Sequence, residues 1–353
     1  MARKLLSGGL ADLRPTPSEP FGQGPGHRLY RYRPSGKVIP TGPPVLLVPP
    51  PAPAAAAAFD LRRGCSLAEH LVATGHRVYL LDLGPGCRRT PAPDLGTWVD
   101  EVLPRAVAEV SRDVDGQPVQ LVGWCLGGIL CVLAAAARPA LPVASITSVA
   151  APVDRDAARR GGPLHELARF AEGAEATLLT FFGGIPRPVA ESGYRLPGID
   201  RYLTRPMAVL THLDDADFLA QTEAEDAFAA EMSDHPAAGL YERFLPGNAL
   251  ARGEVRIGGR QVALADVRVP VLVIAGRDDR SAPWRSVHPL TRLLPHSPDV
   301  RFATAPGGHL GVLTGRRART TTWARLDAWL AEGRVRHGLR APRQRRERLA
   351  SRS

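Results

Sequence analysis

Residues 119–137 read VQLVGWCLGGILCVLAAAA and join a short apolar run to an apolar helical run through a glycine-rich turn. Within the turn, residues 123–127 (GWCLG) have the pattern Gly-x-nucleophile-x-Gly, with Cys125 in the nucleophile position. A tight strand-to-helix turn leaves little room two positions from the nucleophile, which explains the glycines. The following helix N-terminus favours a thiolate. The stretch predicts a reactive thiol; the alternative is a buried structural cysteine.

Strand-like and helix-like segments alternate on both sides of this turn. We expect strands at 27–34, 44–48, 76–83, 119–122, 143–149, 267–275 and 300–303, and helices at 66–74, 95–110, 129–137 and 320–330. Pro104 should kink or restart the second of these helices. Such alternation predicts a mostly parallel central sheet with helices on both faces. The alternation pauses at 155–265, where helical patterns and loops without a clear strand predict an inserted helical cap.

A base and an acid follow the last two predicted strands. His309 lies in the glycine-rich stretch 305–311 (APGGHLG), and Asp279 lies in 276–283 (GRDDRSAP). The order Cys125, Asp279, His309 and the placement of each after a strand match the α/β-hydrolase fold, so we predict a Cys-His-Asp triad. The Gly-x-x-Asp spacing before a proline favours Asp279, and Asp278 is the alternative.

The oxyanion hole should combine the backbone N–H of Leu126 with one N–H from the loop after the 44–48 strand. That loop, residues 48–54, reads VPPPAPA. Because proline has no N–H, we expect the second donor to be Ala52, with Ala54 as the alternative. A rigid polyproline segment with no catalytic role would fit the same residues.

Several further stretches resemble the polyhydroxyalkanoate synthases, also called poly(3-hydroxyalkanoate) polymerases, in their short single-domain form. They are 29–34 (LYRYRP), 75–82 (GHRVYLLD), 151–154 (APVD), 253–260 (GEVRIGGR) and 307–311 (GGHLG). The resemblance implies that Cys125 attacks a 3-hydroxyacyl-CoA thioester, that His309 activates the thiol and then the attacking hydroxyl, and that Asp279 supports His309. It further implies a homodimer or a second synthase subunit, an association with polymer granules, and no cofactor beyond the CoA of the substrate.

The sequence departs from that family around the substrate. Alanines fill 54–58, Leu83 replaces a tryptophan, an arginine-containing stretch at 187–195 replaces an apolar run, and the family's aromatic positions are not recognisable in 222–238. Two other functions therefore stay open. One is a thioesterase or esterase in which water accepts the acyl group; the other is a catalytically silent protein held at a granule or other surface.

Composition sets the remaining expectations. The 353 residues suffice for one α/β domain with a cap, which we place at 27–333 between a flexible segment at 1–26 and a disordered tail at 334–353. That tail holds eight Arg and one Glu, so its net +7 accounts for most of the chain's +10. No nucleic-acid partner is expected, since no nucleic-acid motif accompanies this charge.

The four cysteines and the apolar runs bear on location and metal binding. Cysteines 65, 87, 125 and 131 show no metal-ligand or disulfide spacing, so we expect no metal and a reducing compartment. Cys65 and Cys131 fit core packing, while Cys87 cannot be assigned. With no signal peptide and no span of about 20 apolar residues, a cytoplasmic protein is expected.

Overall fold

The computed structural model describes residues 9–24, 27–36, 38–52, 54–82, 94–159, 212–233 and 245–337. Its main sheet has eight strands in the order β1-β2-β4-β3-β5-β6-β9-β10. The strands β4, β3, β5, β6, β9 and β10 run parallel, and β2 and β1 add an antiparallel edge. Their bounds are β1 Ser18–Gly24, β2 His27–Tyr32, β3 Val45–Val48, β4 Val78–Asp82, β5 Val119–Trp124, β6 Val143–Val149, β9 Val271–Gly276 and β10 Val300–Ala305.

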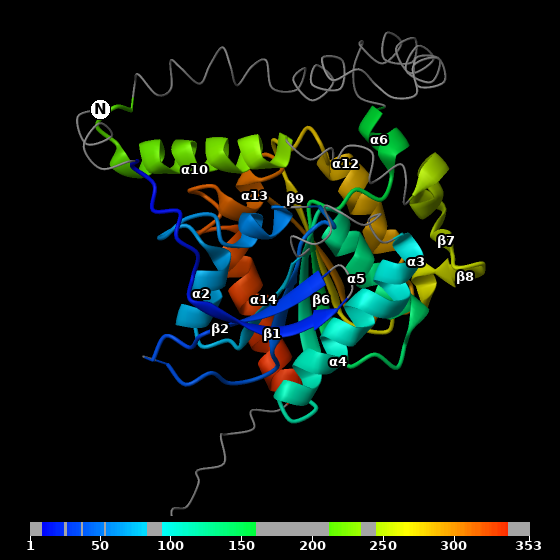
Figure 1. Cartoon of the computed structure of the whole chain (residues 1–353). Coiled ribbons are helices and arrows are strands. Elements are labelled where there is room, and N and C mark those ends of the chain that lie inside the picture. The colour runs from blue at the N-terminus through cyan, green and yellow to red at the C-terminus, as the bar shows by residue number, and fades with distance from the viewer. Residues whose placement is uncertain are drawn as a thin grey trace, which may run out of the picture.

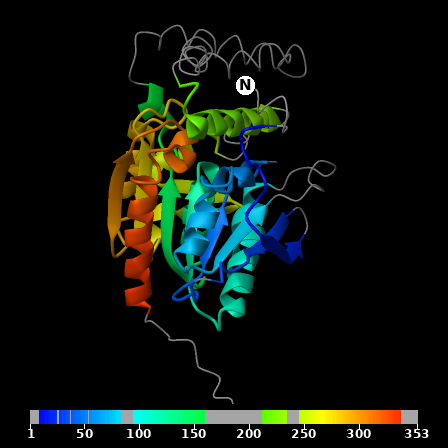
Figure 2. The same cartoon turned by 90° about the vertical axis from the view of Figure 1, so that its left-hand side faces the viewer.

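Helices cover both faces of the sheet (Figures 1 and 2). Leu46, Leu121 and Val273 belong to a buried cluster with α4 (Leu103–Asp113) and α5 (Leu126–Ala137). Their chain neighbours Leu47, Val122 and Ile274 belong to a second cluster, with α2 (Leu67–Ala73) and α14 (Thr322–Arg336). Successive residues of a strand face opposite sides, so strands that are buried on both faces are mostly apolar along their whole length. The predicted α/β fold is confirmed.

The remaining helices are short, apart from the one that crosses the end of the sheet. α10 (Ala216–Ser233) lies over the edge toward which the parallel strands point (Figures 1 and 2). The others are η1 Ala55–Phe59, α3 Leu95–Thr97, η3 Trp98–Val102, α6 Arg155–Arg159, η5 Pro246–Arg252, η6 Leu264–Asp266, α12 Trp284–Val287, η7 His288–Arg292 and α13 Gly311–Thr314. The restart expected at Pro104 takes the form of η3, a π-helical turn directly before α4.

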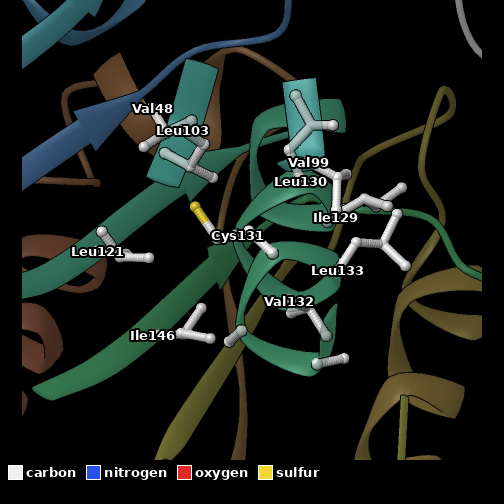
Figure 3. Packing of buried hydrophobic residues seen from close by; sticks show 14 of the residues in the cluster. Val48, Val99, Leu103, Leu121, Ile129, Leu130, Cys131, Val132, Leu133 and Ile146 are labelled. Carbon is white, nitrogen blue, oxygen red and sulfur yellow. The ribbon is translucent and has the colours of Figure 1, made fainter. Parts of the chain in front are cut away.

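The cysteines expected in the core are fully buried. Cys131 lies on α5 among Val48, Leu103 and Leu121, as Figure 3 shows, and burial raises the pKa of its thiol. Cys65 donates from Sγ to the Thr314 carbonyl at 2.7 Å, and burial raises its pKa as well. Both core assignments are confirmed, whereas Cys87 lies outside the described residues.

The predicted cap contains strands that we did not expect. Within 155–265, β7 (Glu254–Ile257) and β8 (Arg260–Ala263) form an antiparallel hairpin, so the expectation of helices and loops alone was wrong. Its two turn residues, at 258 and 259, are glycines with φ of 54° and 81°, which suit a two-residue hairpin turn. The helices α6 and α10 also fall in this range, but 160–211, which includes the arginine-containing stretch at 187–195, lies outside the described residues.

Both ends of the folded α/β domain extend beyond the boundaries that we predicted. β1 lies inside the segment 1–26, which was expected to be flexible, and pairs with β2 through a register shift between Pro20 and Gly22. α14 continues to Arg336, inside the predicted tail, and Arg334 donates to the carbonyls of Thr74 and Gly75. Residues 338–353 are outside the described part of the chain. Among the described helices, none combines the length and apolar character required to traverse a bilayer.

Candidate active site

Cys125 occupies the turn between β5 and α5. Its backbone has φ 55° and ψ −127°, a region that residues other than glycine rarely adopt. Two hydrogen bonds hold the turn: Cys125 N–H donates to the Val149 carbonyl at 2.8 Å, and Gly128 N–H donates to the Cys125 carbonyl at 3.0 Å. The thiol-bearing residue is half-buried rather than sealed in the core. The sharp turn therefore presents Cys125 at the end of the sheet.

The glycines around Cys125 lie where the strand and the helix meet. A Cβ on Gly123 would come within 2.6 Å of the Gly127 carbonyl oxygen. One on Gly127 would overlap the Val48 carbonyl oxygen at the end of β3, and one on Gly128 would lie 2.7 Å from Ser148 Oγ. These separations are far below ordinary van der Waals contact, so the sequence pattern has the steric origin that we predicted.

Asp279 and His309 are brought together from the loops after β9 and β10. His309 Nδ1 lies 2.8 Å from Asp279 Oδ2, and the Asp279 side chain is fully buried. Its other oxygen accepts hydrogen bonds from the N–H groups of Ser281 and Ala282 at 2.9 and 2.8 Å. Asp278 instead accepts from the Gly307 N–H at 3.1 Å. Of the two candidate acids, Asp279 has the contact with histidine.

The charge of the site favours a protonated imidazole. Burial of His309 by itself lowers its pKa, but the electrostatic interaction with Cys125 and the hydrogen bonds to Asp279 and Cys125 outweigh it and raise the pKa to about 10. A positive charge on the half-buried imidazole beside the Asp279 carboxylate follows from the preference of charged groups for opposite charge. The three groups can therefore support a thiolate nucleophile and a proton donor in one place.

The two predicted oxyanion donors differ in their surroundings. Leu126 is the first residue of α5, where an N–H has no acceptor within the helix. The contact that Gly127 makes with Val48 and Pro49 brings the loop after β3 against this helix end. Ala52, however, donates its N–H to the Pro50 carbonyl at 2.7 Å. Its role as second donor stays a prediction and would require that bond to be released.

Trp124 is a site residue that the sequence analysis missed. Its indole Nε1–H donates to the His309 carbonyl at 3.0 Å, and the two rings lie 5.1 Å apart with an interplanar angle of 41°. Apart from its position next to Cys125, the sequence carries no signal for this contact, because His309 is 185 residues away. The described residues contain no cluster of three or more His, Cys, Asp or Glu that could hold a metal.

This geometry is that of the α/β hydrolase fold, and the family so named matches residues 44–315; the chain belongs to it. Within that family, the chain is similar to the poly(3-hydroxyalkanoate) polymerase subunits PhaC of Haloferax mediterranei (26% identical, covering 77% of this chain and 56% of the relative) and Allochromatium vinosum (27% identical, covering 86% and 85%). The PhaC of Haloarcula marismortui is 24% identical, with coverages of 77% and 58%. The resemblance inferred from the sequence is confirmed.

Solved structures agree on the fold. Rv0554 of Mycobacterium tuberculosis superimposes with a TM-score of 0.51 at 20% identity, covering 82% of this chain and 91% of that protein. BpoC of the same organism gives a TM-score of 0.50 at 18% identity, with coverages of 83% and 97%. The chain spans little more than half the length of the Haloferax mediterranei and Haloarcula marismortui relatives.

Proposed function

We propose that this protein is an acyltransferase of the polyhydroxyalkanoate synthase type, which takes 3-hydroxyacyl groups from CoA thioesters through an acyl-cysteine intermediate. The observation that carries the proposal is the 2.8 Å contact between Asp279 and His309 beside the strained elbow of Cys125. The similarity to PhaC subunits supports the substrate class and a homodimer or a second subunit as partner. The proposed chemistry uses only the side chains of the site and the CoA thioester of the substrate.

Acylation begins with attack of the Cys125 thiolate on the thioester carbonyl carbon. The carbonyl oxygen takes up negative charge, and the N–H of Leu126 at the start of α5 is available to stabilise it. Collapse of the tetrahedral intermediate breaks the bond to CoA, and the CoA thiolate takes the proton of the His309 imidazolium. Exchange of one thioester for another is nearly balanced in energy, which suits a cysteine nucleophile.

Transfer then uses His309 as a base. The neutral imidazole accepts the proton of a 3-hydroxyl group as its oxygen attacks the Cys125 acyl carbon. An ester forms, the bond to Sγ breaks, and the thiolate and imidazolium are regenerated. Asp279 orients the ring through Nδ1 and stabilises its positive charge, while the Ser281 and Ala282 N–H groups hold the carboxylate. The same acyl-enzyme would yield free acid if water replaced the hydroxyl.

The direct test supplies 3-hydroxybutyryl-CoA and follows CoA release, the protein mass and the product. Wild-type protein should gain one acyl mass, which maps to Cys125, and Cys125→Ala should gain none and release no CoA. Asp279→Ala should reduce turnover by about 100-fold or more, whereas Asp278→Ala, the matched control on the neighbouring carboxylate, should reduce it far less. An adduct on Cys65, Cys87 or Cys131 would contradict the proposal. Ester oligomers indicate transfer, and free acid alone would indicate the thioesterase alternative.

A further inference from the structure

Trp124 connects the nucleophile's strand to the loop of the catalytic base. It is the last residue of β5 and only 4% exposed, and its indole N–H has the His309 carbonyl as acceptor. Its ring also lies against the imidazole. Trp124 therefore contacts both the backbone and the ring of His309.

A second aromatic ring beside Trp124 comes from α10. Phe228 lies with its ring centre 6.3 Å from that of Trp124, at an interplanar angle of 59°, and is 8% exposed. It continues a buried stripe on α10 formed with Ala220 and Ala224, at a spacing of four residues. The rings of Phe228, Trp124 and His309 thus form a series from α10 to the catalytic base.

α10 is itself fixed to the body of the protein by buried polar contacts. Arg62, 6% exposed, donates to Gln221 at 2.9 Å and pairs with Asp217 at 2.6 Å. Gln221 in turn donates to the carbonyl of Thr314 at 3.0 Å, and Thr314 ends α13, the helix that follows His309. α10 consequently contacts the structure around His309 through two separate residues, Phe228 and Gln221.

We propose that Trp124 is a positioning residue for His309 and that α10, through Phe228, holds Trp124 in place. The helix crossing the end of the sheet then belongs to the catalytic unit rather than serving only as a cover. The inference deepens the proposed function and rests on it, because it assumes that Cys125 and His309 react as a pair. Trp124 acts by positioning the His309 imidazole and not by contacting the substrate.

The chain supplies a matched control. Trp323 on α14 is also buried at 4%, its Nε1–H donates to the Leu313 carbonyl at 2.8 Å, and its ring lies 5.0 Å from that of His70. His70 is paired with Asp327 at 2.8 Å. Trp323→Phe therefore removes the same kind of hydrogen bond beside a His–Asp pair other than that of His309.

The test measures alkylation of Cys125 by iodoacetamide as a function of pH, with the adduct mapped by peptide mass. The alkylation rate measures the fraction of Cys125 present as thiolate and requires no acyl-CoA. In Trp124→Phe, a displaced imidazolium should stabilise the thiolate less, so the alkylation rate at pH 7 should fall about three- to tenfold, as expected for loss of one hydrogen bond. The midpoint of the profile should move to higher pH by about half a unit to one unit. Phe228→Leu should shift it the same way by less, and Trp323→Phe should change the rate less than about twofold.

Two results would overturn the inference. If Trp124→Phe keeps the wild-type profile while His309→Ala shifts it, Cys125 and His309 form a pair but Trp124 does not position it. If Trp323→Phe shifts the profile as much as Trp124→Phe does, general loosening of the fold explains both. A different result would defeat the proposed function itself. If wild-type protein and His309→Ala have the same pH profile of Cys125 alkylation, Cys125 and His309 do not act as a pair. Circular dichroism and thermal midpoints confirm that each variant is folded.

Discussion

Replacing Cys125 by glycine should give a more stable protein than replacing it by alanine, and both changes should abolish acyl transfer. At φ 55° and ψ −127°, a residue with a Cβ is strained, and such conformations cost about 1–3 kcal/mol. Glycine removes that strain but loses about 0.5–1 kcal/mol through the greater freedom of the unfolded chain. Compared with Cys125→Ala, which keeps the Cβ and also lacks the thiol, Cys125→Gly should be more stable by about 0.5–2 kcal/mol.

Thermal and urea unfolding of the two variants measure this difference. For a chain of 353 residues the unfolding entropy is large, so the expected gain corresponds to a rise in thermal midpoint of only about 1–3 °C. Urea midpoints with equal m-values would confirm that stability, and not the denatured state, has changed. A Cys125→Gly protein that unfolds at or below the midpoint of Cys125→Ala would refute the argument that the elbow stores backbone strain.

The other predictions concern the base, the elbow and the C-terminus. The pKa of His309 is raised from 6.5 to about 10, so the stabilisation from its protonated form is complete below pH 6.5 and is lost as the pH rises through 10. The free energy of unfolding should therefore fall between these pH values, and it should fall less in His309→Gln. Gly127→Ala should destabilise the fold by about 2 kcal/mol or more through overlap with Val48, while Gly311→Ala, which meets no neighbouring atom, should change urea stability by less than about 0.5 kcal/mol. Ending the chain after residue 337 should leave the thermal midpoint unchanged, whereas ending it after 333 should lower it, since Arg334 bonds to two carbonyls; equal midpoints would contradict the boundary drawn here.

Sequence patterns predicted the fold because its determinants are local. Apolar strands, helical periodicity and the glycines beside Cys125 each act within a few residues, and each predicted strand of the central sheet is present. The β7–β8 hairpin was missed because its strands have four residues each, too few for a clear alternation, although the two glycines between them were a signal. β1 was hidden in a stretch rich in glycine and proline.

For the candidate site, too, the residues set by local sequence could be predicted and those set by long-range packing could not. Cys125, Asp279 and His309 could be predicted because the fold places each at the carboxyl end of a strand, and the structure brings Asp279 and His309 into contact. Local sequence could not show whether the N–H of Ala52 is available as an oxyanion donor. In the structure this N–H donates to the carbonyl of Pro50, within the same loop. Trp124 and Phe228 could not be predicted, because their contacts join segments that are distant in sequence and depend on packing alone.

The order of strands in the sheet also bears on how the chain is made. β9 pairs with β6, yet 121 residues separate the end of β6 at Val149 from the start of β9 at Val271. During translation the apolar edge of β6 emerges long before its partner, and unpaired apolar edges invite association with other chains. The ribosome also delivers Cys125 well before Asp279 and His309. A prematurely terminated chain would thus expose the unpaired edge of β6 and carry the Cys125 thiol without its base.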